Sequence, residues 1–223
     1  MRFILFYKFI NGDDMKTLKI ALTSMFLLIS SYASTVEISG NVALSSDYIW
    51  RGITQTNGDV AISGGFDLAA DNGFYLGTWA SNASAGTASM ELDIYLGFSG
   101  EMAENMTYDI GYISVNYPGN DGADFEEAYI AFNFYGLNLL YSDGQNNGPS
   151  YSEIAYSVEA GPGAVTVSYG EYENTGDNFL VGYDWNVGEF TLGFYYFDYE
   201  DDASVAGGPA SDDGAYISIG RSF

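Results

Sequence analysis

The chain has 223 residues and contains no cysteine and no histidine, which excludes disulfides, Cys/His zinc sites and every mechanism that needs an imidazole or a thiolate. The formal net charge is −24. A chain of this charge repels the phosphates of DNA and RNA, so no nucleic-acid partner is expected.

Residues 1–33 are expected to be a signal peptide. A basic start is followed by an apolar run at residues 20–29 and by small residues up to Ala33, where signal peptidase is expected to cut. A helix of that length spans about 15 Å, too little for a hydrocarbon core of about 30 Å, so cleavage is favoured over a membrane-anchoring helix. Met15 is the more natural start of the protein, and the presence of residues 1–14 is interpreted as the result of a start codon assigned too far upstream.

Residues 34–223 are expected to form one domain, because nothing in their composition divides them. Of the 30 acidic residues only Asp13 and Asp14 precede this domain, which therefore carries 28 acidic residues against Arg51 and Arg221, a net charge of −26. Cations are the natural partners of such a chain.

From residue 36 the side chains alternate between apolar and polar, which is typical of strands with one apolar and one polar face. In the first such run, residues 36–51, the apolar face includes Tyr48 and Trp50, and the polar face includes Asp47 and Arg51. Aromatic residues make up 17% of the chain, which suits strands. Eleven further runs bring the total to about twelve strands, and they lie at residues 60–68, 74–81, 90–98, 108–112, 127–134, 137–142, 153–158, 164–171, 179–185, 189–199 and 215–223.

The links between these strands alternate in length. Tight links are expected at residues 70–73, 135–136, 161–163 and 186–188. Longer polar links are expected at residues 51–59, 81–88, 117–123, 142–150, 172–177 and 200–214. One link, residues 99–105, falls at the end of the short turns but is longer than they are. Short turns at one end and long loops at the other are typical of an outer-membrane barrel with its short turns in the periplasm.

These patterns predict an all-β fold: a transmembrane antiparallel up-and-down β-barrel of about twelve strands, with short periplasmic turns and longer extracellular loops, in the outer membrane of a Gram-negative bacterium. Phe223, with Ile217 and Ile219 on the same face, resembles the C-terminal assembly signal of outer-membrane proteins, although Arg221 departs from that pattern and would have to snorkel. The expected partners are outer-membrane lipid, lipopolysaccharide, periplasmic chaperones and the barrel-assembly machinery. A β-sandwich shows the same alternation and stays open as the competing fold.

Aromatic and glycine motifs follow one another in a fixed order through the mature domain. They are Ser46–Gly52 with Gln55-Thr56, Gly64–Asp67, Gly73–Trp79, Glu91–Tyr95, Tyr108–Tyr112 and Tyr117–Gly119. In order and spacing they resemble the TorF-type porin family, small bacterial outer-membrane proteins formerly described as conserved hypothetical. The resemblance is densest from residue 41 to residue 135 and implies an outer-membrane, porin-like role.

The polar face is the strongest functional candidate, because it is almost purely acidic. Low-dielectric walls focus the potential of such a face, which attracts cations and repels anions. We therefore predict a narrow passive diffusion pore for small cations or small polar solutes, with Arg51 projecting inward near the first outer loop. The pore-lining candidates are Asp47, Arg51, Asp67, Glu91, Asp93, Asp109, Glu127, Glu153 and Asp184.

Two alternatives to this pore stay open. The inward acids could satisfy one another and neighbouring Tyr, Ser and Asn groups through hydrogen bonds in a filled barrel. The barrel could also be a non-conducting structural or surface-interaction protein, adhesin-like, that acts through its extracellular loops. The oligomeric state does not follow from the sequence.

No catalytic residue, cofactor or metal site is expected. The Ser–His pairing of barrel lipases is unavailable without histidine. Glu91 and Asp93 lie about 7 Å apart by strand geometry, but they are better interpreted as two lumen-facing acids than as a glycosidase pair. The acidic loop at residues 200–214 could bind calcium, yet its spacing fits no defined loop motif, and a hydrated outer loop is the favoured interpretation.

Overall fold

The computed structural model describes residues 35–146, 148–202 and 209–223. The expected signal peptide, residues 1–33, lies outside these ranges. The chain divides into two units, Met1–Thr35 and Val36–Phe223, and the second is described below. In the part of the chain that the structure describes, no helix is long and apolar enough to cross a membrane.

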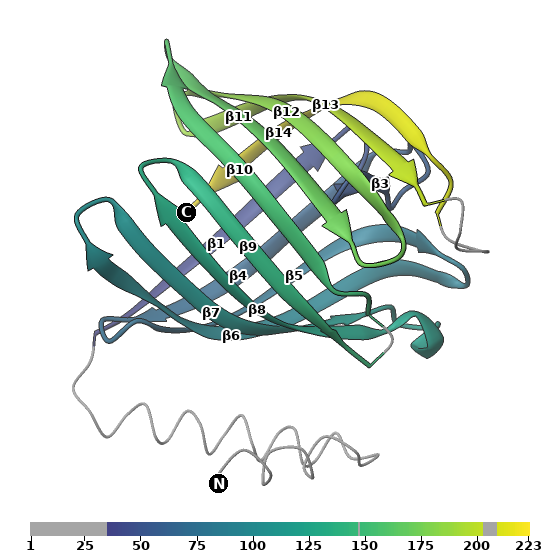
Figure 1. The fold of residues 1–223 in the computed structure, drawn as a ribbon, viewed down its shortest axis with the longest axis horizontal. Helices are drawn as coiled ribbons and strands as arrows, with labels where there is room; N and C mark the ends of the chain where they lie inside the picture. The colour runs from purple at the N-terminus through teal and green to yellow at the C-terminus, as the bar shows by residue number, and fades with distance from the viewer. Residues whose placement is uncertain (1–34, 147, 203–208) are drawn as a thin grey trace, which may run out of the picture. The chain divides into compact units, whose positions relative to one another are not determined.

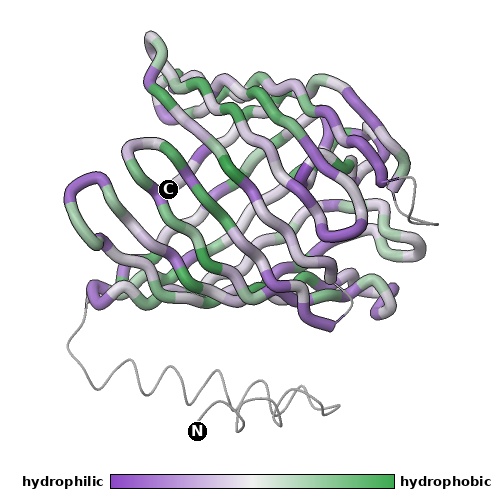
Figure 2. The backbone as a smooth tube through the Cα atoms, viewed as in Figure 1, coloured by the Kyte–Doolittle hydropathy of each residue, from purple (hydrophilic) through white to green (hydrophobic). Residues whose placement is uncertain are grey.

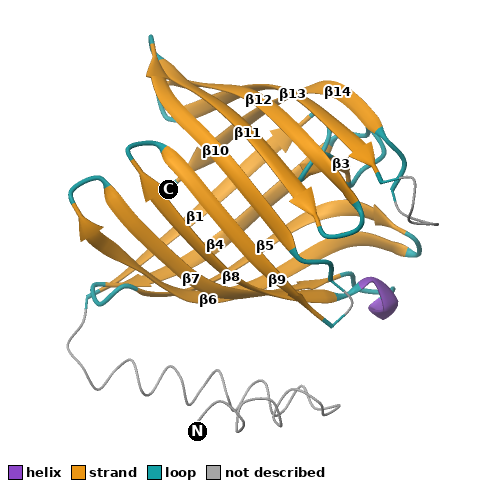
Figure 3. Cartoon of the chain, in the orientation of Figure 1, coloured by secondary structure: helices purple, strands orange, loops and turns teal. Residues whose placement is uncertain are grey.

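The second unit is a closed barrel of twelve antiparallel strands (Figures 1 and 3). Each strand pairs with the next one along the chain, and β1 closes the barrel by pairing with β14. The expected all-β, up-and-down barrel of twelve strands is therefore confirmed, and the sandwich is excluded. The strands are β1 (Val36–Ser45), β4 (Ala61–Ala70), β5 (Phe74–Ala85), β6 (Ala88–Ala103), β7 (Met106–Asn116), β8 (Phe125–Phe134), β9 (Leu137–Gln145), β10 (Tyr151–Ala160), β11 (Gly163–Tyr172), β12 (Gly176–Val187), β13 (Phe190–Asp201) and β14 (Asp212–Ser222).

Side chains alternate across the barrel wall with the period of two that a strand imposes. On β4, Ile62 and Phe66 are 64% and 61% exposed, whereas on β6 the carboxylates of Glu91 and Asp93 are buried. Since the barrel is closed, the exposed apolar positions face outward and the buried polar positions face the interior. Hydrophobic residues recur along the strands, and several of the loops and turns are hydrophilic (Figure 2).

Short turns and longer links occupy opposite ends of the barrel, and the loops lie on the right of Figure 1. Two expected links were wrong. β6 continues to Ala103, so the link at residues 99–105 shrinks to a turn at residues 104–105, and β5 and β6 extend until only residues 86–87 join them. Both misjudged segments contain small polar residues, which blur the alternation, while the ladder of backbone hydrogen bonds does not depend on side chains.

The barrel closes where the first and last strands meet. Their register runs from Asn41↔Ser222 to Ser45↔Ser218. Phe223 extends the seam, because its amide donates to the carbonyl of Gly40 and its carbonyl accepts from the amide of Gly40, both at 2.9 Å. Its ring lies over Gly40, where an added Cβ would come within 2.9 Å of the ring. The position of this glycine therefore allows the terminal aromatic ring to pack on the seam.

Candidate functional site

The link between β1 and β4, residues 46–60, folds into the barrel interior, and we call it the inward segment. It contains a small hairpin made of β2 (Ile49–Trp50) and β3 (Ile53–Thr54). The expected first strand extended through residue 51, with Tyr48 and Trp50 on its apolar, outward face. That expectation was wrong, because the barrel strand ends at Ser45 and both aromatic residues lie in the inward segment.

Asp47 holds the base of the inward segment. Its carboxylate oxygen Oδ1 accepts hydrogen bonds from the hydroxyls of Thr54 and Thr56, at 2.8 Å and 2.7 Å. Thr56 in turn accepts a hydrogen bond from the amide of Tyr48 at 3.1 Å, and its side chain is only 1% exposed. Asp47 is therefore not a mid-strand residue, as the alternation had suggested, but fastens the two ends of the hairpin to each other.

Tyr48 connects the inward segment to the wall at β6. Its hydroxyl donates to Glu91 at 2.6 Å, and the hydroxyl of Tyr117 donates to the other oxygen of the same carboxylate at 2.5 Å. The ring of Tyr48 also meets Trp79 of β5 edge-on, with centroids 5.2 Å apart. One face of the inward segment is thus bonded and packed against β5 and β6.

Arg51 and Gly52 form the tip of the hairpin, a two-residue turn between the paired residues Trp50 and Ile53. Both turn residues have positive φ, 48° and 81°, as a type I′ turn requires. Gly52 packs against the opposite wall, where an added Cβ would lie 2.6 Å from the Cβ of Asn178 on β12. The left-handed backbone costs Arg51 about 1–2 kcal/mol, and tertiary contacts must hold it there.

Those contacts form what we call the guanidinium cage: Glu127, Ser142, Trp50, Tyr151 and Tyr172. The guanidinium of Arg51 donates to both carboxylate oxygens of Glu127, at 2.6 Å and 2.7 Å, and more weakly to Ser142 at 3.4 Å. Its central carbon lies 4.8 Å, 4.0 Å and 5.6 Å from the ring centroids of Trp50, Tyr151 and Tyr172. The cage therefore combines a bidentate carboxylate with three aromatic rings.

The ion pair inside the cage is withdrawn from solvent. The side chain of Arg51 is 10% exposed and that of Glu127 is 2% exposed. Burial lowers the pKa of Arg51, whereas its hydrogen bonds to Glu127 and the nearby charges raise it, and the net shift is upward. The guanidinium of Arg51 therefore keeps its positive charge inside the cage.

The other predicted site residues lie on the inner face of the strands, and most of them accept a hydrogen bond from a tyrosine. Asp93 is the exception: it is 4% exposed, and its Oδ1 has no hydrogen-bond partner among the described residues. The tyrosine pairs are Tyr95 with Asp67 at 2.5 Å, Tyr75 with Asp109 at 2.6 Å, Tyr151 with Glu153 at 3.0 Å, and Tyr195 with Asp184.

Tyrosine was named as a possible partner of the inward acids, but the individual pairs were not predicted, because the tyrosines cited in the alternation were placed on its apolar face. A signal was nevertheless present in the alternation, since Tyr95 shares its parity with the carboxylates of Glu91 and Asp93, and Tyr129 shares its parity with Glu127. Tyr75 links two such groups, because its hydroxyl bonds Asp109 and also lies 2.6 Å from the hydroxyl of Tyr129. A tyrosine on the acidic face of a strand is thus a marker of these networks.

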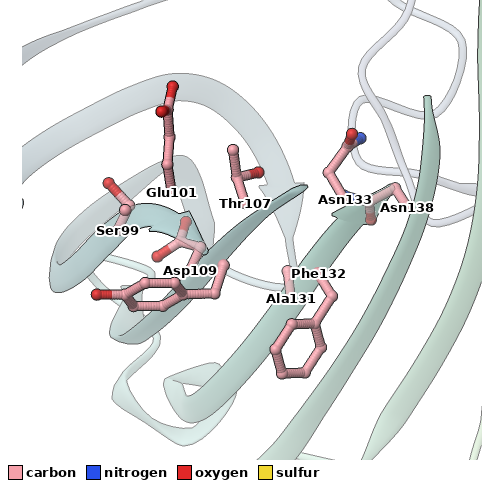
Figure 4. A pocket seen from close by; sticks show the side chains of 10 residues that line it. Ser99, Glu101, Thr107, Asp109, Ala131, Phe132, Asn133 and Asn138 are labelled. Carbon is pink, nitrogen blue, oxygen red and sulfur yellow. The ribbon is translucent and has the colours of Figure 1, made fainter. Parts of the chain in front are cut away.

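A cavity of about 450 Å³ lies at the turn end of β6–β9 (Figure 4). Glu101, Thr107 and Asn133 point to the same side of the sheet in this view, and Phe132 points to the opposite side. Asp109 also lines the cavity. Its lining combines polar side chains with Tyr108, Ala131 and Phe132, and it lies at the end of the barrel opposite to the packed layer around Arg51.

The described ranges contain no group of three or more acidic side chains placed to hold a metal ion. The acidic loop at residues 200–214 is only partly described, because residues 203–208 fall outside those ranges.

Comparison with known proteins identifies the fold and the family. A solved structure of the KdgM porin in complex with disordered oligogalacturonate is similar, with a TM-score of 0.56, 7% identity, and coverage of 85% of this chain and 98% of that chain. Two other solved structures match more weakly. LpxR from Salmonella typhimurium has a TM-score of 0.45 and 9% identity, with coverage of 83% of this chain and 99% of that chain. Salmonella typhi OmpF in complex with daunomycin has a TM-score of 0.42 and 10% identity, with coverage of 85% and 98%. A search of curated proteins found no match.

A family model matches residues 30–208. Its description does not carry the TorF name, so the specific resemblance to TorF-type porins stays a prediction. The matched region includes the inward segment and most of the barrel strands. The chain belongs to the family described as "Bacterial protein of unknown function (Gcw_chp)".

Proposed function

We propose that this chain is an outer-membrane porin of a Gram-negative bacterium, a passive and cation-preferring channel for small solutes. In this proposal residues 1–33 direct export, the barrel-assembly machinery inserts residues 34–223, and the tight turns lie in the periplasm. The observation that carries the proposal is the acidic inner face, in which a single arginine is already paired with a carboxylate.

The outer surface supports a position in a lipid bilayer. Large apolar side chains that would be buried in a soluble protein are exposed here, among them Ile38 at 71%, Ile62 at 64% and Ile217 at 59%. Hydrocarbon is the environment that suits a surface of this kind. A closed barrel also satisfies every strand edge internally, which spanning a membrane requires. The fold similarity to a porin points the same way.

The charge of the interior supports cation preference. The KdgM porin has been solved in complex with disordered oligogalacturonate. The interior of this chain is acidic, since its strands place carboxylates inward and Arg51 is paired with Glu127. An anionic solute would meet repulsion there, and a cationic or neutral solute would not.

The inward segment is proposed to be the constriction of this channel. It contacts β5 and β6 through Tyr48, β8–β11 through Arg51, and β12 through Gly52. It therefore narrows the interior toward the loop end, while the cavity of about 450 Å³ at the turn end leaves room for solute.

A non-conducting barrel is the second candidate, and one observation favours it. Three inward carboxylates are almost completely buried: Glu91 is 3% exposed, Asp93 4% and Glu127 2%. This layer of the interior is therefore packed by protein atoms and is not open to solvent. If the inward segment never moves, the interior is closed and the barrel acts through its outer loops.

Bilayer recordings separate the two candidates. The purified barrel is inserted into a planar lipid bilayer, and its current is measured under a salt gradient. We expect discrete conductance steps with cation preference, and Asp109→Asn should reduce that preference more than Glu189→Gln, which removes a 71%-exposed carboxylate at a turn. A preference for anions would overturn the proposal. The absence of any current in both the parent chain and Arg51→Ala would also overturn it.

A further inference from the structure

The guanidinium cage is built by the barrel wall, whereas its occupant comes from a loop. Glu127, Ser142, Tyr151 and Tyr172 belong to the consecutive strands β8, β9, β10 and β11. The rings of Tyr151 and Tyr172 also contact each other, with centroids 4.7 Å apart and planes inclined by 52°. The wall residues are therefore held by the sheet whether or not Arg51 is present.

The geometry of the cage selects for a guanidinium group. Two short hydrogen bonds to one carboxylate need a planar fork of donors, which an ammonium group does not offer. The ring of Tyr151, at 4.0 Å, adds a cation–π surface that suits a flat and weakly hydrated cation.

Stability alone does not account for the ion pair. Buried ion pairs contribute little net stability compared with well-packed apolar residues, because both charges lose their hydration. Arg51 also has the left-handed backbone of the turn, which an arginine adopts at a cost. Strain of this kind is typical of functional positions. Arg51 thus resembles a tethered ligand held in a binding site.

We propose that the guanidinium cage is a recognition site for small solutes that carry a guanidinium group, and that Arg51 occupies it when no solute is present. This inference rests on the proposed channel, because a solute reaches the cage through the barrel interior. A solute that takes the place of Arg51 at Glu127 frees the tip of the inward segment and widens the constriction. The cage thereby couples recognition of the solute to its passage.

Removal of Arg51 should leave the cage able to bind a free ligand. The inward segment keeps its other contacts, since Tyr48 still donates to Glu91, and the amide of Ser84 on β5 still donates to the carbonyl of Gln55 at 2.7 Å. Ile53 also packs against the tyrosine cluster of Tyr151 and Tyr172. Trp50, as part of the hairpin, therefore remains in place as the third ring.

Calorimetric titration of the folded barrel in detergent tests the binding step. The probe is guanidinium chloride at millimolar concentration, with sodium chloride as the ionic-strength reference. Arg51→Ala should bind guanidinium saturably and at least about twofold more tightly than the parent chain, because in the parent chain the tethered guanidinium of Arg51 competes at an effective concentration in the millimolar range. Arg51→Ala combined with Glu127→Gln should lose the binding.

Arg221→Ala is the matched control for this titration. Arg221 also pairs with a carboxylate, Glu189, at 2.9 Å, and lies 6.0 Å from the ring of Phe190, but the pair is on the outer surface and solvent-exposed. Its removal changes the net charge as much as the removal of Arg51, and it should bind guanidinium no better than the parent chain.

Three results would overturn the cage as a guanidinium site. They are equal binding by Arg51→Ala and by the variant that also lacks Glu127, equal affinity of Arg51→Ala and the parent chain, and equal binding of guanidinium and sodium. A heat-dependent shift in gel mobility verifies that each variant is folded. If Arg51→Ala does not fold, Arg51→Lys replaces it, and it should also bind guanidinium more tightly than the parent chain.

Bilayer recordings separate failure of the cage from failure of the channel. Guanidinium added on the loop side should raise the conductance of the parent chain, and Glu127→Gln should abolish this rise. Binding in detergent with silent bilayers would refute the channel and leave the cage as a ligand site. A conducting barrel whose conductance responds equally to guanidinium and sodium would refute the cage and leave the channel.

Discussion

Glu127→Gln should release the tip of the inward segment, at Arg51, from the barrel wall. In the parent chain the carboxylate of Glu127 accepts two hydrogen bonds from the guanidinium of Arg51, at 2.6 Å and 2.7 Å. The substitution replaces this carboxylate with a neutral amide, while the side chain of Arg51 remains only 10% exposed. Removing one partner of a buried ion pair costs about 3–5 kcal/mol. Because the segment is a link and not a barrel strand, Arg51 can regain water by leaving the cage, and the cost should appear as release and not as unfolding.

Trypsin measures this release, because it cuts after lysine and arginine, and residues 34–223 contain only Arg51 and Arg221. A loss of about 3 kcal/mol raises the released population about 100-fold. Cleavage after Arg51 should accelerate by a comparable factor when reclosing is faster than cleavage. Glu189→Gln, which removes the surface partner of Arg221, should leave cleavage after Arg51 unchanged. Equal cleavage rates in Glu127→Gln and the parent chain would refute the role of the pair.

Three further substitutions test other parts of the account. Gly52→Ala should accelerate the same cleavage after Arg51, since the added Cβ would lie 2.6 Å from the Cβ of Asn178. Gly58→Ala is the control, because Gly58 has a similar φ of 80° but no atom within 4 Å of an added Cβ, and it should have a smaller effect. A larger effect in Gly58→Ala than in Gly52→Ala would contradict the packing of the tip. Phe66→Arg should lower the free energy of unfolding in lipid vesicles by about 2–4 kcal/mol, and no loss would argue against a lipid-facing wall. Tyr48→Phe removes one of the two phenol donors to Glu91 and should cost about 1 kcal/mol in urea unfolding; an unchanged midpoint would contradict that contact.

The barrel was predictable because the alternation of side chains repeats in nearly every strand. The runs at residues 60–68 and 90–98 correspond to β4 and β6, and their apolar residues have the parity of the outer face. The limits of the strands were less predictable where small residues dominate. Residues 81–85 contain Ser, Asn and Ala, which suggest a loop, but backbone pairing carries β5 through to Ala85.

The inward segment was not predictable from the alternation. Tyr48 and Trp50 continue the apolar parity of β1, and local sequence does not indicate that the chain leaves the sheet after Ser45. Their inward position depends on partners such as Trp79, which the closure of the barrel brings near.

The candidate site was predictable in its residues but not in its contacts. Arg51 stands out as one of two basic residues after residue 34, and Glu127 stands out as an acid on a strand. Their pairing joins residues 76 positions apart across the barrel interior, so it depends on the curvature and register of the whole sheet. The alternation assigns a face to each residue, but it does not say which residues meet across the interior.

The reversal potential of the parent chain under a tenfold gradient of potassium chloride tests the central claim most directly. A perfectly cation-selective pore would give about 59 mV in magnitude. The acidic inner face predicts a potential with the sign of cation selectivity, which should move toward zero in Asp109→Asn. A potential of zero, or one with the sign of anion selectivity, would contradict a cation-preferring channel.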